Sequence, residues 1–242
     1  MRATAVLAII GLVGVAQAAQ AQERIRIGVN GVELVTTRTL SQDFSLTKNL
    51  EKAPIGADID LPSSPLFDVG ASVRLVKGLA VGIAYSSLSH TVGGTVDAQI
   101  PHPFYYSKLR DIGGNISGLN ETEKAVHVAV FYFIPLGRLD LGVFGGPSRF
   151  DVKQDLITDV TYTELYPFDT ATFASAPTTS VTRTAMGYNL GADVTWRLSR
   201  VVGVGGLIRF ATASTKLEVA PGNEVTTDVG GLQTGVGLRL IF

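Results

Sequence analysis

Serine, histidine and aspartate residues lie close together between residues 87 and 97, a combination that can carry acyl-transfer chemistry. Ser87 or Ser89 could act as the nucleophile, His90 as its general base and Asp97 as the carboxylate that orients the histidine. Serines and histidines near one another at the end of a strand are commonplace, so this spacing alone does not predict an enzyme. We therefore expect no catalytic activity.

The two remaining histidines give no pattern for a metal site. His102 lies between two prolines, His127 is distant in sequence, and the chain has no cysteine. Because a metal site needs cysteines or suitably spaced histidines, we expect no metal and no cofactor. The formal net charge of -1 likewise gives no reason to expect nucleic acid as a partner.

Most of the other polar side chains that could build a site recur at every second residue of otherwise apolar or glycine-rich segments. If these segments are strands, the polar side chains share one enclosed face, where charges must pair or contact water. The pattern predicts a salt-bridge plug or, alternatively, a narrow polar conduit. The residues of this polar network are Arg26, Asn30, Asp68, Arg74, His127, Asp140, Asn189, Asp193, Arg197, Arg209, Gln233 and Arg239.

Eight segments with alternating apolar and polar residues must position the polar network. Alternation with a period of two predicts strands with one apolar face and one polar face. The first face then carries residues such as Val194, and the second carries residues such as Asp193. The segments are 24–31, 65–76, 79–86, 126–134, 139–144, 186–198, 204–210 and 232–242.

The apolar face of these segments is expected to lie in a membrane. Mean hydropathy is +0.28, yet no stretch after residue 22 is apolar over 18 residues, which excludes transmembrane helices. A closed barrel is the other structure that satisfies every backbone group in lipid. Residues 1–21 resemble a secretory signal peptide, with Arg2, an apolar run to Ala16 and cleavage expected after Ala18 or Ala21. Residues 22–242 are expected to form one barrel domain.

Short and long connections alternate between the eight segments. Turns are expected at 77–78, 137–138 and 199–200, and longer connections at about 38–64, 87–124, 149–182 and 221–223. In outer-membrane barrels the periplasmic turns are short and the extracellular loops are long. The pattern therefore predicts an all-β, closed, antiparallel, up-and-down transmembrane barrel of eight strands with both termini in the periplasm.

The last segment carries apolar residues at alternate positions and ends on an aromatic residue: Val236, Leu238, Leu240 and Phe242. Together with the signal peptide and the eight segments, this ending resembles the small outer-membrane β-barrel family, which contains OmpA transmembrane domains, OmpX and OmpW. The resemblance covers the whole mature chain. It implies an outer membrane of a Gram-negative cell, contact with its lipid, and an assembly signal in these four residues for the barrel assembly machinery. Thr234 departs from the family pattern, in which an apolar or aromatic residue is more usual.

Two of the expected long connections are rich in proline and aromatic residues, unlike disordered loops, so we expect them to fold over the barrel mouth or to extend its strands above the membrane. These residues could form a self-packed lid, a pocket for an apolar solute, or a contact surface for another cell or protein. We expect a structural or interaction role at the cell surface, with a passive channel for small or hydrophobic solutes as the alternative implied by OmpW. The aromatic residues are Phe104, Tyr105, Tyr106, Tyr162, Tyr166, Phe168 and Phe173.

Deletion of Phe242 tests the implied assembly signal. We expect the deletion variant to accumulate in the periplasm or to be degraded, because the terminal aromatic residue is lost while little packing at the lipid boundary depends on it. Immunoblots of separated membrane and periplasmic fractions measure the distribution. A normal yield of the variant in the outer membrane would contradict the assignment.

Overall fold

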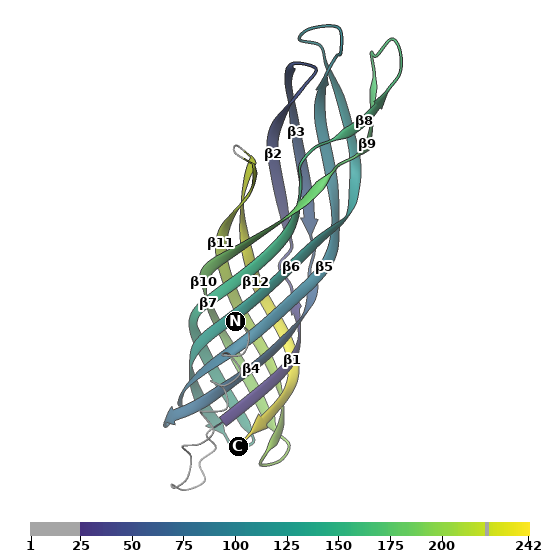
Figure 1. Cartoon of the computed structure of the whole chain (residues 1–242). Coiled ribbons are helices and arrows are strands. Elements are labelled where there is room, and N and C mark those ends of the chain that lie inside the picture. Colours follow the sequence, from purple (N-terminus) through teal and green to yellow (C-terminus); the bar gives the residue numbers. More distant parts are fainter. Residues whose placement is uncertain (1–24, 221–222) are drawn as a thin grey trace, which may run out of the picture.

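The computed structural model describes residues 25–220 and 223–242, so the expected signal peptide and the Pro221–Gly222 pair lie outside the described residues. Within the described ranges the chain forms strands, turns and short irregular segments. No helix of this part of the chain is long and apolar enough to cross a membrane. Figure 1 shows a long cylinder whose strands run obliquely to its axis.

Eight strands of the described chain close into an antiparallel ring, which confirms the predicted barrel. β1 pairs with β4 on one side and with β12 on the other, so the ring has no free edge. Two backbone hydrogen bonds, of 3.0 and 2.8 Å, join Ile25 to Phe242 at the C-terminal end. The ring strands are β1 (Ile25–Leu34), β4 (Ser64–Val76), β5 (Leu79–Pro101), β6 (Leu109–Leu136), β7 (Leu139–Ile157), β10 (Thr178–Arg197), β11 (Val202–Ala220) and β12 (Asn223–Ile241).

Most of the far end of the cylinder, opposite the C-terminus, is also strand, so the barrel strands extend above the apolar band, one of the two expected arrangements. β2 (Arg38–Lys48) and β3 (Glu51–Leu61) form a hairpin that extends the sheet beside β5. β8 (Thr161–Glu164) and β9 (Ala171–Ser175) form a smaller one. β5 and β6 continue to residues 101 and 109, so only residues 102–108 connect them. The alternation continues there with polar residues outside, which is why apolar outer faces alone did not identify these strands.

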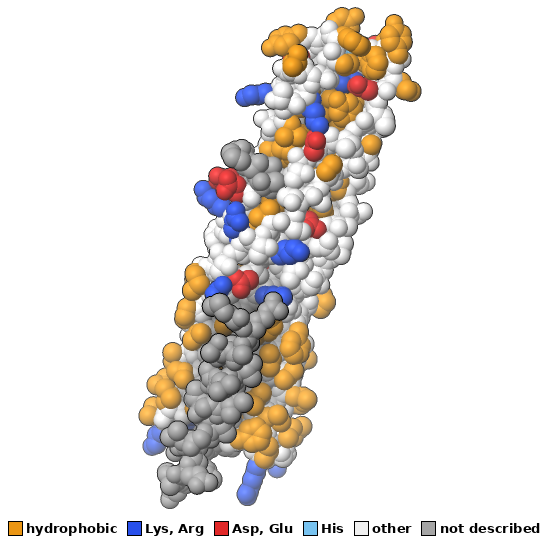
Figure 2. Space-filling view, in the orientation of Figure 1, with side chains coloured by type: hydrophobic (Ala, Val, Ile, Leu, Met, Phe, Trp, Pro, Cys, Tyr) orange, Lys and Arg blue, Asp and Glu red, His pale blue; other side chains and the backbone are white. Residues whose placement is uncertain are grey.

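An apolar band surrounds the half of the barrel nearest the C-terminus. Figure 2 shows apolar side chains gathered over this half and fewer of them in the stretch directly above it. Tyr132 and Trp196 are exposed beside the turns at this end, as in the aromatic girdle of a membrane barrel. Outward positions become polar above the band, as at Lys124 and Arg149. The exposed residues of the band include Val29, Ile83, Val128, Val194, Ile208 and Leu238.

Apolar side chains occupy much of the interior above the middle of the band. Three of the four buried apolar clusters follow one another along the axis, and Leu88, Val92 and Val96 of β5 each belong to a different one of these three. Each cluster joins several strands of the barrel wall. The far cluster, for example, packs Phe44 of β2 against Ile112 of β6 and Ile157 of β7.

The variant Val194→Arg tests which outer surface lies in lipid. Val194 is 40% exposed within the apolar band, and an arginine there should lower the free energy of unfolding by about 2 to 4 kcal/mol. Thr91→Arg is the matched control, because Thr91 is exposed on the outer face of β5 above the band and its substitution should cost less than about 0.5 kcal/mol. Urea titrations followed by heat-modified gel mobility measure both. Equal costs would contradict the position of the band.

Candidate functional site

Arg26, Asp140 and Arg197 form the end of the polar network closest to the C-terminus. Arg26 and Arg197 each direct an Nη2 atom at Oδ2 of Asp140, at 2.5 and 2.6 Å. The Arg26 guanidinium also lies 4.2 Å from the centre of the Phe133 ring. Arg74 faces the same end and is close enough to Arg26 to repel its charge. This end of the lumen therefore has more positive than negative charge.

The middle of the polar network is a continuous chain of hydrogen bonds. Arg239 donates from Nε to Oδ2 of Asp193 at 3.0 Å and from Nη1 to the Asn30 side-chain oxygen at 2.5 Å. Asn30 donates in turn to Asp68 at 2.8 Å. Arg209 donates to the other Asp68 oxygen at 2.8 Å, and both of these side chains are only 3% exposed. The chain ends with a bond of 2.7 Å from Arg209 to Gln233.

His127 lies at the upper side of the polar network and is held by hydroxyl groups. Its Nε2 contacts Oγ of Ser86 at 3.0 Å, and its Nδ1 contacts Oγ of Ser148 at 2.8 Å. Asn189 also donates to Ser148, at 2.8 Å. The edge of the buried Phe150 ring completes the surroundings. Both ring nitrogens are thus in use, which favours a structural role for this histidine.

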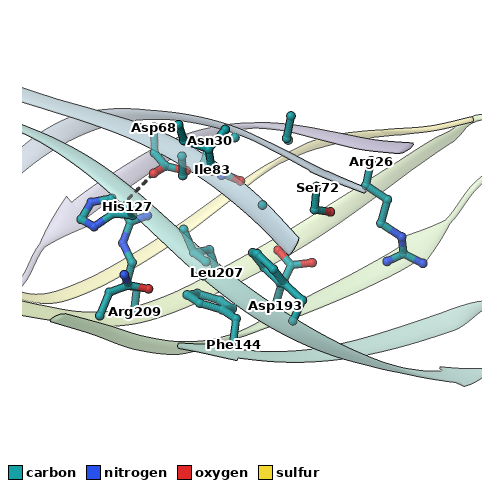
Figure 3. Close-up of a pocket in the computed structure, with 18 of the residues that line it drawn as sticks. Arg26, Asn30, Asp68, Ser72, Ile83, His127, Phe144, Asp193, Leu207 and Arg209 are labelled. Carbon is teal, nitrogen blue, oxygen red and sulfur yellow. Dashed lines mark hydrogen bonds and ion pairs between the residues drawn. The ribbon is translucent and has the colours of Figure 1, made fainter. Parts of the chain in front are cut away.

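A small cavity remains inside the polar network. Its volume is about 80 Å³, and Arg26 marks one end while His127 and Arg209 mark the other (Figure 3). Phe131 and Phe144 line it together with the polar side chains. These rings fit because glycines lie beneath them: a Cβ on Gly191 would come within 2.5 Å of the Phe144 ring. The packing of phenylalanine rings over glycines therefore limits the volume of the cavity between the charged side chains.

A second polar cluster lies above the apolar band, and the sequence interpretation missed it. His90 contacts Glu121 at 2.6 Å through Nε2 and Ser64 through Nδ1. Arg38 of the added hairpin lies 3.6 and 3.7 Å from the carboxylates of Glu121 and Glu123. Burial raises the pKa of Glu123, although Arg38 opposes this shift. Glu121 and Glu123 continue the inward alternation of β6, a signal that was available in the sequence.

The acyl-transfer arrangement considered from the sequence does not form. Ser87 and Ser89 are on the opposite face of β5 from His90, and Ser89 instead contacts Thr122 at 3.2 Å. Asp97 is exposed on that same outer face. The hydroxyl that does contact His90 belongs to Ser64, which is 3% exposed. Among the described residues, no group of three or more His, Asp or Glu side chains could hold a metal ion.

The aromatic set predicted in the long connections is divided between two places. Tyr162 and Phe173 are half-buried against the far apolar cluster. The Phe168 ring lies 5.5 Å from that of Phe104 and 6.0 Å from that of Tyr166, at the far end. Tyr105 and Tyr106 are exposed in the β5–β6 connection. The structure therefore does not gather the seven residues around one pocket.

The four residues of the implied assembly signal lie together on the outer face of β12. Val236, Leu238, Leu240 and Phe242 are all exposed within the apolar band. Each alternates with an inward residue such as Arg239, which belongs to the polar network. Their role in assembly stays a prediction.

Known proteins resemble this chain in fold but not in sequence. No protein-family model and no curated protein sequence matches the chain. Among solved structures, the outer membrane protein OprG from Pseudomonas aeruginosa matches over 91% of this chain and 96% of its own, at 9% identity and a TM-score of 0.50. This chain has the fold of the small outer-membrane β-barrels. The ring of eight strands and its apolar band suit that membrane.

Two further solved barrels are less similar. Neisserial surface protein A matches over 90% of this chain and 97% of its own, at 10% identity and a TM-score of 0.43. Ail, the attachment invasion locus protein of Yersinia pestis, matches over 91% of this chain and 100% of its own, at 11% identity and a TM-score of 0.41. The barrel fold with both termini in the periplasm orients the far end toward the cell exterior.

The variant Asp68→Asn tests whether the polar network holds the barrel together. It leaves the buried Arg209 guanidinium without its carboxylate, so the free energy of unfolding should fall by about 3 to 5 kcal/mol. Adding Arg209→Gln should recover part of this loss. Arg74→Gln is the control, since no ion pair to Arg74 occurs among the described residues, and it should cost under about 1 kcal/mol. Urea titrations compare the variants, and equal losses for Asp68→Asn and Arg74→Gln would refute the idea.

Proposed function

We propose that this protein is a non-conducting outer-membrane barrel with a structural and interaction role at the cell surface. The observation that carries the proposal is the closed interior, in which paired charges occupy the membrane level and apolar clusters, with the His90–Glu121–Arg38 contacts between them, occupy the barrel above it. Surrounding lipid and, during biogenesis, the barrel assembly machinery are its proposed partners within the cell.

The two parts of the interior oppose conduction for different reasons. At the membrane level an ion would have to separate buried pairs such as Asp68 and Arg209, which stabilise one another where little water is present. Farther out, it would meet Leu156 and Leu217, which are fully buried in the middle cluster and offer no polar contact. An eight-stranded barrel is just wide enough for side chains to fill, so both parts can close it.

A passive channel for small or hydrophobic solutes is the second candidate. It is favoured by the cavity in the polar network, where Phe131, Phe144 and Leu207 provide apolar contacts at the membrane level. Conduction would then require the lowest apolar cluster, around Leu66 and Val32, to move aside. We rank this candidate below the non-conducting barrel because that cluster is densely buried.

We also infer that the protein is not an enzyme. A serine nucleophile needs access to its substrate, and the serine beside His90 is buried between the added hairpin and the barrel. The Ser64, His90 and Glu121 contacts are better explained as the anchor of that hairpin, since Arg38 joins the same carboxylate from β2.

Recordings of purified protein in planar lipid bilayers test the proposed function. We expect no stable conductance steps above the protein-free bilayer, and no swelling of vesicles that contain the protein in isotonic solutions of small sugars. A channel would give steady conductance, and loss of the Asp68 charge in Asp68→Asn would change its ion selectivity. Such a current in the native protein would replace the first proposal with the second.

A further inference from the structure

The far end of the cylinder carries unusually exposed apolar side chains. Their exposed fractions run from 74% to 96%, and they come from three separate hairpin ends. Figure 2 shows apolar side chains gathered at this end, separated from the membrane band by a mostly polar stretch. We call these residues the tip surface: Leu50, Phe104, Tyr106, Leu165 and Tyr166.

Leu50 is the most exposed residue of the tip surface and has an unusual backbone conformation. It occupies the β2–β3 turn after Asn49, with φ angles of 48° at Asn49 and 68° at Leu50. Two consecutive positive φ angles are typical of a hairpin turn that favours glycine at the second position. A leucine there is strained, and because its side chain is 96% exposed, packing within the protein does not offset that strain. Contact with a partner therefore explains a leucine at this position better than the fold of the protein does.

Polar contacts hold the three hairpin ends together. The Glu51 carboxylate accepts the backbone N–H of Ser107 at 2.9 Å, which joins the β2–β3 turn to the β5–β6 connection. Lys108 of that connection pairs with Asp169, and Arg110 of β6 pairs with Glu164, each at 2.5 Å, which joins this end to the β8–β9 hairpin. An ordered surface loses less conformational entropy on binding than free loops would.

The membrane in which the barrel lies is too far away to cover the tip surface. About 15 residues of β6 separate Lys124, at the upper limit of the apolar band, from Leu109. At roughly 3.3 Å per residue and a tilt of about 40°, the tip stands about 40 Å above that limit. The partner must therefore approach from outside the cell.

We propose that the tip surface inserts into the headgroup layer of a second lipid membrane facing the cell. This inference rests on the proposed interaction role and names the chemistry of the partner. The tip consists of separate hairpin ends, and several of its side chains are more than four-fifths exposed. A fluid lipid layer can bury separate protruding side chains, whereas a protein partner would need a matching pocket for each.

Residue types and charge both suit a lipid surface without net charge. Tyrosine places its ring among lipid chains and its hydroxyl at the headgroups, and Tyr106 and Tyr166 are the two most exposed aromatic residues of the tip surface. Two cations at the β5–β6 end of the tip, Lys108 and Arg110, are paired with Asp169 and Glu164. Zwitterionic lipid should therefore suffice.

Co-flotation tests the inference with the full-length protein in lipid nanodiscs and protein-free phosphatidylcholine vesicles. We expect the native protein to float with the vesicles. The triple variant Leu50→Ser, Tyr106→Ser and Leu165→Ser should reduce the bound fraction at least tenfold. The matched control, Leu50→Met, Tyr106→Phe and Leu165→Met, keeps the tip apolar and should bind like the native protein. Heat-modified gel mobility verifies that each variant is folded.

Two further variants give independent readouts. Leu50→Gly relieves the turn, so it should fold at least as well as the native protein yet bind vesicles more weakly. Tyr106→Trp in a Trp196→Phe background places the only tryptophan at the tip, and brominated lipid confined to the partner vesicles should quench its fluorescence.

The outcomes separate this inference from the proposed function. If the native protein binds whole cells through the tip surface but never protein-free vesicles, the partner is not zwitterionic lipid, and the inference fails while the interaction role stands. If the serine variant binds cells and vesicles as well as the native protein does, the tip surface has no role in contact. If native protein binds neither, the interaction role fails as well.

Discussion

Every backbone N–H and C=O group of a chain in lipid must find its partner within the protein, and ring closure is how this chain meets that requirement. The nine residues of β1 from Arg26 to Leu34 pair with β12, although the two strands lie at opposite ends of the sequence. Without that pairing, two edges of unpaired groups would face lipid. The small diameter of the barrel, and so the narrowness of its interior, follows from closing only eight strands.

A narrow interior leaves little room for water, which determines how the inner side chains are used. Asp140 accepts two arginines at Oδ2, and Asp68 binds both Asn30 and Arg209, so each of these buried carboxylates serves two partners. Glycine at the inward position of one strand gives room to a phenylalanine from its neighbour, as Gly142 does for Phe133. Charge pairing and ring packing therefore both follow from the narrow interior of the barrel.

The sequence predicted which face of each membrane strand turns inward, because a period of two follows directly from strand geometry. It did not predict which charges pair. Arg26 and Asp140 are separated by 114 residues, and their contact depends on the register and stagger of strands across the ring. It also missed Glu121 and Glu123, since the outer face of β6 becomes polar above the band and an apolar stripe no longer marks the strand.

The same strands thus pass from lipid into water, and the residue types on their outer face change where the solvent changes. Inside, buried apolar residues recur along β5 from Leu88 to Ile100, with His90 between them facing Glu121. Outside, apolar residues give way to polar ones where the lipid ends, which is what water requires of a solvated strand. Leu50 and Tyr166 break this rule at the far end, where no membrane of the same cell reaches. Below the tip, the outward residues are apolar in lipid and polar in water. By the same rule, the exposed apolar residues at the tip indicate contact with a second apolar phase.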